Sequence, residues 1–138
     1  MPETVLLTGV SGFIAKHVAL KLLNAGYDVR GTVRRLDRGD EVRAALASHL
    51  GEKAGRLTFA QADLEADAGW SEAMAGVAAV VHTASPFPIA QPKDPQDLIR
   101  PAVDGTRRVL EAAATAGVRR IVLTSSVAAV LDLTRGNC

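Results

Sequence analysis

A pair of glycines near the N-terminus constrains the fold of this chain more than any other feature. Gly9 and Gly12 follow the short apolar run 5–7, which is typical of a strand buried on both faces. After the second glycine, apolar residues recur at every fourth position, as in an amphipathic helix, at Ile14, Val18 and Leu22. A strand, a glycine turn and a helix in this order predict a phosphate-binding turn, because a helix N-terminus offers free N–H groups to an anion.

Each position of this turn has a mechanical role. Gly9 allows the chain to turn tightly, and Gly12 lets the backbone approach a pyrophosphate closely. Ala15 takes the place of a third glycine and still permits the helix to pack closely on the strand. Glycines end helices and strands in many proteins, so the pattern alone is weak evidence. Its position between a strand and an amphipathic helix favours a dinucleotide-binding turn.

The rest of the chain alternates short apolar runs with helical patterns. We expect further strands over 29–33, 57–60, 80–82 and 120–124, and helices over 40–50, 71–74 and 97–116. Asp40 is expected to cap its helix, Gly31 to weaken its strand, and Pro101 to bend the long helix. Alternating strands and helices predict parallel βαβ units, and right-handed crossovers give the strand order 3-2-1-4-5. The sequence therefore predicts a single α/β Rossmann domain over residues 1–138.

The residues after the second expected strand indicate which dinucleotide would bind. An NAD site places Asp or Glu there to hold the ribose 2′-hydroxyl. Here Arg34 and Arg35 end the strand, Arg38 follows closely, and Asp28 stands at the wrong end. A guanidinium suits a 2′-phosphate, so we predict NADP(H), with NAD(H) less favoured and a solvated basic loop as the alternative. Asp63, after the third strand, could accept from the adenine amino group or cap the next helix, and the sequence favours neither.

Composition excludes several other classes of function. The net charge is only +1, so we expect no nucleic-acid partner. The longest apolar runs, such as 77–81, are far too short to span a membrane. Cys138 is the only cysteine, and no secretory signal precedes the first strand, which suits a cytoplasmic protein. His17 and His49 have no neighbours at metal-ligand spacing, so no metal is expected, and His82 is interpreted as a packed or hydrogen-bonded core residue.

Seven motifs run through the chain in a fixed order. They are Thr8-Gly9-x-x-Gly12-Phe13-Ile14, Gly31-Thr32-Val33-Arg34, Ala62-Asp63-Leu64, His82-x-Ala84-Ser85-Pro86, Lys93-Asp94-Pro95, Pro101-x-x-x-Gly105-Thr106 and Val122-Leu123-Thr124-Ser125-Ser126. Together they resemble the dihydroflavonol reductase and cinnamoyl-CoA reductase branch of the extended short-chain dehydrogenases/reductases. The resemblance covers Val5 to about Val130. Two positions depart from it: Ala15 replaces a usual glycine, and Arg35 replaces a frequent aspartate, which would make the pocket more basic.

This resemblance implies a role for each matching residue. Around the pyrophosphate it places Gly9, Ser11, Gly12, Phe13 and Ile14; on the 2′-phosphate, Arg34; and at the adenine, Asp63 and Leu64. Along the nicotinamide ribose it places Thr83, Ala84 and Ser85, and near the nicotinamide, Thr124 and Ser125. Ser126 matches the catalytic serine that hydrogen-bonds the substrate carbonyl, although from the residues alone it could equally cap a turn.

The reaction that the resemblance implies is hydride transfer from NADPH to a small-molecule aldehyde or ketone. There a tyrosine donates the proton, and a lysine four residues later lowers its pKa. The only tyrosine here is Tyr27, Gly31 stands four residues after it, and the strand ends that bind ligands are expected far away. We therefore expect the cofactor-binding part of such an enzyme, ending before the sixth strand and the substrate lobe, and inactive alone.

Three interpretations stay open at this point. The first is an oxidoreductase fragment, the second is a non-catalytic dinucleotide-binding module, and the third is a fragment of a nucleotide-sugar epimerase or dehydratase. Arg34 argues against the third, which needs retained NAD. An ending before the sixth strand would also leave the fifth strand as an exposed apolar edge, so we expect self-association through it.

Overall fold

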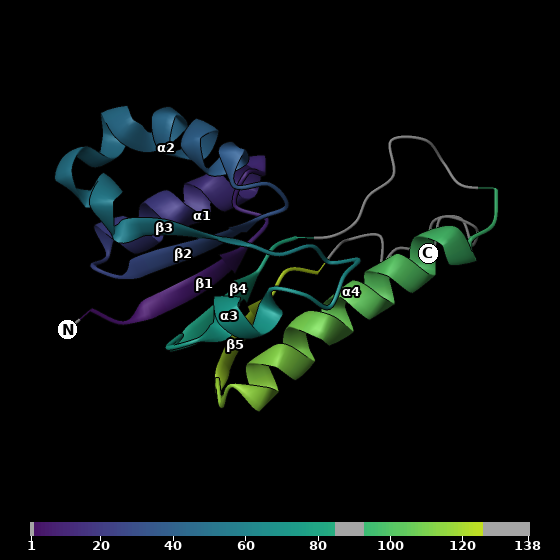
Figure 1. The fold of residues 1–138 in the computed structure, drawn as a ribbon. Coiled ribbons are helices and arrows are strands. Elements are labelled where there is room, and N and C mark those ends of the chain that lie inside the picture. The colour runs from purple at the N-terminus through teal and green to yellow at the C-terminus, as the bar shows by residue number, and fades with distance from the viewer. Residues whose placement is uncertain (1, 85–92, 126–138) are drawn as a thin grey trace, which may run out of the picture.

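The computed structural model describes residues 2–84 and 93–125 of the chain, and its centre is one parallel sheet. The strands are β1 (Thr4–Thr8), β2 (Asp28–Val33), β3 (Leu57–Gln61), β4 (Ala79–His82) and β5 (Arg120–Leu123). Their order is β3-β2-β1-β4-β5, which confirms the predicted α/β Rossmann topology (Figure 1). The strand order therefore reverses at β1, which pairs with β2 on one side and β4 on the other.

Helices cover both faces of the sheet. They are α1 (Phe13–Asn24), α2 (Asp37–Leu50), the 3-10 helix η1 (Gly51–Arg56), α3 (Trp70–Met74) and α4 (Gln96–Thr115). In Figure 1, α1 and α2 lie on one face, and α3 and α4 lie on the other. Leu7 belongs to the core under α1 and α2, whereas its neighbour Leu6 belongs to the core under α3 and α4, because successive strand residues point to opposite faces.

Helix α1 buries a different repeat from the one that the apolar pattern emphasises. Its buried residues are Ala15, Ala19 and Leu23, while Ile14 is 63% exposed. The small alanines let the helix lie close to the sheet, so the buried face is shifted by one position from Ile14, Val18 and Leu22. The helix period was predicted correctly, but the fully buried positions are Ala15, Ala19 and Leu23, and Val18 and Leu22 are only partly buried beside them.

The start of α2 corrects a second expectation. The helix begins at Asp37 rather than Asp40, Leu36 is its N-cap residue, and no side chain caps it. Backbone bonds from the N–H of Arg38 to the Arg35 carbonyl and from the N–H of Gly39 to the Leu36 carbonyl begin the turn early. Asp40 therefore lies within the first turn of α2 and is not the residue that caps its N-terminus. The six-residue helix η1 that follows α2 was not predicted.

The other elements agree with the sequence to within a residue or two. Helix α4 continues through Pro101, which lies inside it. All four residues of β5 are exposed, so the last strand of the described sheet is an open edge, as predicted. Within the described residues, none of the helices has the length and apolar character that crossing a membrane requires.

Candidate functional site

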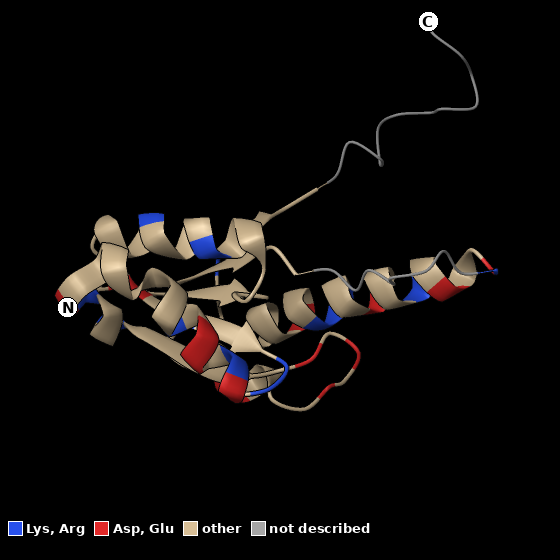
Figure 2. Ribbon diagram, turned by 90° about the horizontal axis from the view of Figure 1, so that it is seen from above, with Lys and Arg blue, Asp and Glu red and all other residues tan. Residues whose placement is uncertain are grey.

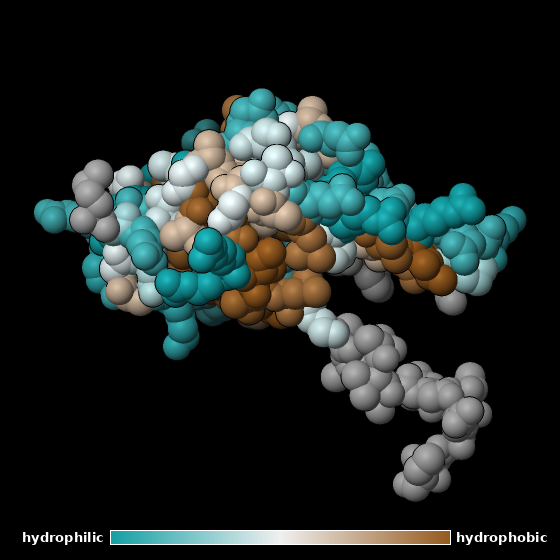
Figure 3. Space-filling view, turned by 90° about the horizontal axis from the view of Figure 1, so that it is seen from below, coloured by the Kyte–Doolittle hydropathy of each residue, from teal (hydrophilic) through white to brown (hydrophobic). Residues whose placement is uncertain are grey.

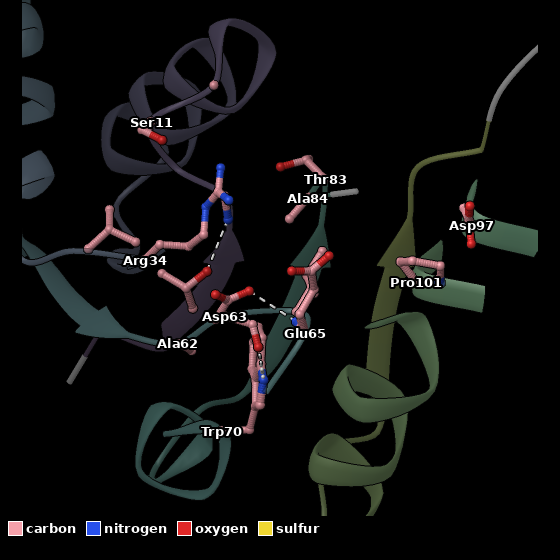
Figure 4. Close-up of a pocket in the computed structure, with 15 residues that line it drawn as sticks. Ser11, Arg34, Ala62, Asp63, Glu65, Trp70, Thr83, Ala84, Asp97 and Pro101 are labelled. Atoms are coloured by element: carbon pink, nitrogen blue, oxygen red, sulfur yellow. Dashed lines mark hydrogen bonds between the residues drawn. The ribbon is translucent and has the colours of Figure 1, made fainter. Parts of the chain in front are cut away.

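A pocket of about 440 Å³ lies at the carboxyl ends of the strands, where the strand order reverses. This is where open α/β sheets bind ligands, and the volume lies in the usual range for a small-molecule site. Of the residues predicted to bind a cofactor, the pocket is lined by Gly9, Ser11, Gly12, Arg34, Asp63, Leu64, Thr83 and Ala84. The fold thus brings together side chains from the ends of four separate strands (Figure 4).

The glycine turn forms the floor of this pocket. Gly9 has a φ of 63°, a conformation that favours glycine, and a Cβ there would lie 2.8 Å from the Cβ of Ala84. The Gly9 N–H donates to the Thr32 hydroxyl at 3.0 Å, and the Gly12 N–H donates to the Gly9 carbonyl at 3.0 Å. The turn therefore touches both β2 and the segment after β4, which fixes its position.

The N-terminus of α1 opens beside the turn. Its N-cap is Gly12, and its first turn contains no acidic residue, so no carboxylate of that turn offsets the positive end of the helix dipole. Such an end attracts anions. Phe13 and Ile14 begin the helix, but their side chains are 78% and 63% exposed and do not line the pocket. Their predicted place around the pyrophosphate stays a prediction.

Arg34 differs from its two neighbouring arginines in its partners. Arg35 pairs with Asp37 at 2.7 Å, and Arg38 pairs with Glu41 at 3.0 Å, both on the surface. In Figure 2 these charges alternate at the start of α2. Within the described residues, Arg34 makes no ion pair, and it alone of the three lines the pocket. Arg35 is thus paired on the surface and does not line the pocket, so its expected contribution to a more basic pocket stays a prediction.

Asp28 lies at the opposite end of β2 from Arg34. Its carboxylate accepts a hydrogen bond from Arg56 Nε at 2.7 Å, an ion pair that joins β2 to the end of η1. Asp28 thus has a structural partner away from the pocket. Its position agrees with the inference that no acidic residue of β2 serves a ribose hydroxyl.

Asp63 begins the loop at the β3 side of the pocket. Its carboxylate accepts from the Glu65 N–H at 3.0 Å, and the next helix begins only at Trp70 with Gly69 as its N-cap. Asp63 therefore does not cap that helix, and its expected contact with the adenine stays a prediction. Trp70 Nε1 donates to the Asp63 carbonyl at 3.0 Å and to the Ala66 carbonyl at 3.1 Å, so the first residue of α3 fixes this loop.

Arg108 fixes the same loop from α4. It donates to the Leu64 carbonyl at 2.7 Å and to the Asp67 carboxylate at 2.6 Å. Close packing accompanies these bonds, since a Cβ on Gly105 would lie 3.1 Å from the Leu64 Cβ. The β3 side of the pocket is therefore held between α3 and α4.

A buried polar pair joins the ends of β1 and β4. The Thr8 hydroxyl lies 2.7 Å from Nδ1 of His82, and the two residues are register partners. His82 is only 2% exposed, and this burial lowers its pKa below the usual value. The prediction that His82 is a hydrogen-bonded core residue is confirmed.

Thr124 and Ser125 are described and are not among the residues that line the pocket. Thr124 and Ser125 follow β5 and are exposed, and the Thr124 N–H donates to the His82 carbonyl at 3.0 Å. Ser85 and Ser126 lie outside the described residues. The roles expected for these four residues therefore stay predictions. Among the described residues, no group of three potential ligands could hold a metal ion.

Sequence reasoning missed part of the pocket wall. The missed lining residues are Thr32, Val33, Ala62, Glu65, Trp70, Asp97 and Pro101. Three of these residues are sequence neighbours of predicted site residues: Thr32 and Val33 precede Arg34, and Ala62 precedes Asp63. Their position in the quoted motifs could therefore have predicted them. Asp97 and Pro101 come from α4, and only the packing of that helix brings them to the pocket.

Comparison with known proteins places this chain in a family. Residues 5–135 match the model of the NAD dependent epimerase/dehydratase family. The chain is 45% identical over 128 residues to cinnamoyl-CoA reductase 1 of Petunia hybrida, covering 93% of this chain and 36% of that protein. It is 38% identical over 127 residues to dihydroflavonol 4-reductase of Hordeum vulgare, covering 91% of this chain and 35% of that protein.

A solved structure shows the same relationship. The yeast methylglyoxal/isovaleraldehyde reductase Gre2, complexed with NADPH, superposes with a TM-score of 0.81 at 30% identity, covering 97% of this chain and 40% of that one. The chain thus spans well under half the length of these relatives.

Proposed function

This chain belongs to the NAD dependent epimerase/dehydratase family, and from that premise we propose that it is the NADP(H)-binding part of an oxidoreductase. The observation that carries the proposal is Arg34, the one arginine after β2 that lines the pocket and has no ion-pair partner among the described residues. The reaction is the reduction of a small-molecule aldehyde or ketone to an alcohol. Similarity to cinnamoyl-CoA and dihydroflavonol reductases supports a carbonyl of the cinnamoyl or dihydroflavonol type.

The pocket residues fit such a cofactor in three places. Arg34 would hold the 2′-phosphate, because its planar guanidinium can donate two parallel hydrogen bonds to phosphate oxygens. Gly9 and Gly12 would meet the pyrophosphate, where the lack of side chains lets the backbone come close. Asp63 would accept from the adenine amino group. The nicotinamide half would then lie toward Thr83 and Ala84, across the reversal of strand order.

Reduction of a carbonyl needs other groups in addition to the residues that bind the cofactor. Bound NADPH supplies a hydride, and a proton must reach the carbonyl oxygen at the same centre. Tyr27 precedes β2, at the amino ends of the strands, and the pocket lies at their carboxyl ends. We therefore propose that Tyr27 is not the proton donor and that the 138-residue chain binds the cofactor without turning over a substrate. Ser126 is proposed as the serine that hydrogen-bonds the substrate oxygen.

Thermal unfolding with added dinucleotide tests the cofactor proposal. A ligand at about a hundredfold excess over its Kd stabilises the folded state by about 2.7 kcal/mol. NADPH is expected to raise the melting temperature of the 138-residue chain well above the effect of NADH at equal concentration. An equal effect of the two would remove the role of Arg34, and no effect of either would overturn the proposal.

A non-catalytic dinucleotide-binding module is the second candidate, favoured by the absence of a tyrosine near the pocket in this chain. Both candidates predict no turnover by this chain, and oxidation of NADPH in the presence of aldehydes and ketones tests this shared expectation. We expect no substrate-dependent oxidation by the 138-residue chain. Substrate-dependent turnover would show that the chain carries its own proton donor, and the proposal that it only binds would then fail.

A further inference from the structure

Thr8 is the centre of a buried hydrogen-bond network at the reversal of strand order. It is the last residue of β1 and is fully buried. Its hydroxyl lies 3.0 Å from the N–H of Thr83, 3.0 Å from the N–H of Ala84 and 2.7 Å from His82 Nδ1. Its carbonyl accepts from the Thr83 hydroxyl at 2.6 Å. The Thr8 side chain thus links the end of β1 to the last residue of β4 and to the two residues that follow it.

The number of partners fixes the direction of each hydrogen bond. A threonine hydroxyl has two acceptor lone pairs and one proton. Two backbone N–H groups occupy the lone pairs, so the proton must be donated to Nδ1 of His82. His82 is therefore the neutral tautomer with its proton on Nε2, an assignment that follows from the network. Its burial favours the neutral form as well.

The network positions one wall of the pocket. Thr83 and Ala84 both line it, and Ala84 lies so close to the glycine turn that a Cβ on Gly9 would be 2.8 Å from its Cβ. The Thr8 hydroxyl holds the backbone amides of these two residues, and His82 in turn holds that hydroxyl. A shift of either residue would move the β4 wall relative to the turn.

We propose that Thr8 and His82 are positioning residues for the nicotinamide half of the cofactor, and this inference rests on the proposed function. A dinucleotide lies across the reversal of strand order in this fold. Arg34 and Asp63 stand on the β2 and β3 side, so the adenosine half lies there and the other half meets the β4 wall. The network therefore acts on one half of the ligand only.

Two ligands separate this role from general structural support. NADPH contains both halves, whereas 2′,5′-ADP contains the adenosine half with its 2′-phosphate and no nicotinamide. Thr8→Val keeps the shape of the side chain and removes the hydroxyl. We expect it to raise the Kd of NADPH about tenfold, equivalent to about 1.4 kcal/mol, and to change the Kd of 2′,5′-ADP by less than about twofold.

Conservative variants and a matched control sharpen the test. Thr8→Ser keeps the hydroxyl, and His82→Asn offers a carbonyl oxygen near the Nδ1 position, so both are expected to retain most of the affinity for NADPH. His82→Leu removes that acceptor and is expected to behave like Thr8→Val. Thr58→Val makes the same change in β3, where the hydroxyl has only a 3.5 Å contact to the Val29 carbonyl, and is expected to leave both Kd values unchanged.

The outcomes are distinguishable. If the unmodified chain binds neither ligand, the proposed function fails and the inference fails with it. If it binds both, and Thr8→Val weakens both equally or neither, only the positioning role is overturned. Should Thr8→Val or His82→Leu fail to fold, the ¹⁵N spectrum of His82 in the unmodified chain decides, with His82→Asn identifying its signals. The neutral Nε2–H tautomer supports the inference, and an Nδ1–H tautomer or a charged ring at neutral pH overturns it.

Discussion

The side chain of Val10 occupies the space that a side chain on Gly31 would need: a Cβ built there would lie 2.5 Å from Val10 Cγ1. Val10 is the fully buried residue of the glycine turn, and its N–H donates to the Thr32 carbonyl at 3.1 Å. The glycine of β2 therefore makes room for the turn, a role in packing that the sequence analysis did not anticipate.

Gly31→Ala should destabilise the protein and weaken cofactor binding together. The added methyl group must displace Val10 and the turn, and overpacking of this kind costs about 1–3 kcal/mol. Urea unfolding measures the loss. Gly55→Ala is the control, because a Cβ there meets no atom within 4 Å and its φ is not positive. A change at Gly31 no larger than at Gly55 would contradict the account.

The strand order and the phosphate-binding turn were predictable from sequence because both depend on local patterns. The glycine turn, the apolar runs and Arg34 each show their role within a few residues of chain. The pairing of Arg35 with Asp37 was missed because the sequence analysis considered the charge of Arg35 alone. The Thr8–His82 network joins residues 74 positions apart, and Asp97 and Pro101 reach the pocket through the packing of α4. Such contacts depend on tertiary structure and leave no local signal.

Arg34 and Arg35 should respond differently to the same substitution. Arg34→Gln removes the guanidinium that faces the pocket, and hydrogen bonds to charged groups are worth about 1.5–3 kcal/mol, so the affinity for NADPH should fall about ten- to hundredfold. The affinity for NADH should hardly change. Arg35→Gln removes only an exposed ion pair and is expected to leave both affinities near their original values. Calorimetric titration checks this, and equal losses in the two variants would refute it.

Arg108→Met should loosen the loop between β3 and α3. Methionine keeps much of the side-chain packing but cannot donate to the Leu64 carbonyl or to Asp67. We expect faster amide hydrogen exchange over residues 64–69 and weaker binding of 2′,5′-ADP, because Asp63 and Leu64 line that side of the pocket. Arg107→Met, one position away on the exposed side of α4, is the control. Unchanged exchange in Arg108→Met would show that α3 alone holds the loop.

The stability of the protein should decrease on mild acidification because of His82. Burial lowers its pKa from the value of 6.5 that it has when unfolded, so the unfolded state binds more protons as the pH falls. The contribution to stability is complete above pH 6.5 and is lost as the pH falls below it toward the folded-state pKa. Urea midpoints measured from about pH 7.5 to about pH 5.5 should therefore decline, and His82→Asn should flatten the decline. The same slope in His82→Asn would assign the effect elsewhere, and His49→Asn, on the exposed part of α2, is the control.

The open edge of the sheet is predicted to promote self-association. Ile121, Val122 and Leu123 are 36%, 62% and 49% exposed on β5, and Figure 3 shows apolar side chains gathered on the face seen from below. Unpaired edge strands pair with other chains, and a lysine on such an edge opposes this. Light scattering should detect oligomers that grow with concentration, and Val122→Lys should reduce them. A strictly monomeric chain at all concentrations would contradict the prediction.

Binding of NADP(H) in the pocket can be followed directly through Trp70, the only tryptophan in the chain. Its side chain lines the pocket, is 3% exposed and is bonded through Nε1 to the Asp63 carbonyl, so its fluorescence should report a ligand there. NADPH is expected to quench Trp70 fluorescence saturably, at lower concentration than NADH does, and Arg34→Gln is expected to remove this preference. Quenching that never saturates, or that NADH produces at the same concentration, would contradict the claim that this pocket binds NADP(H).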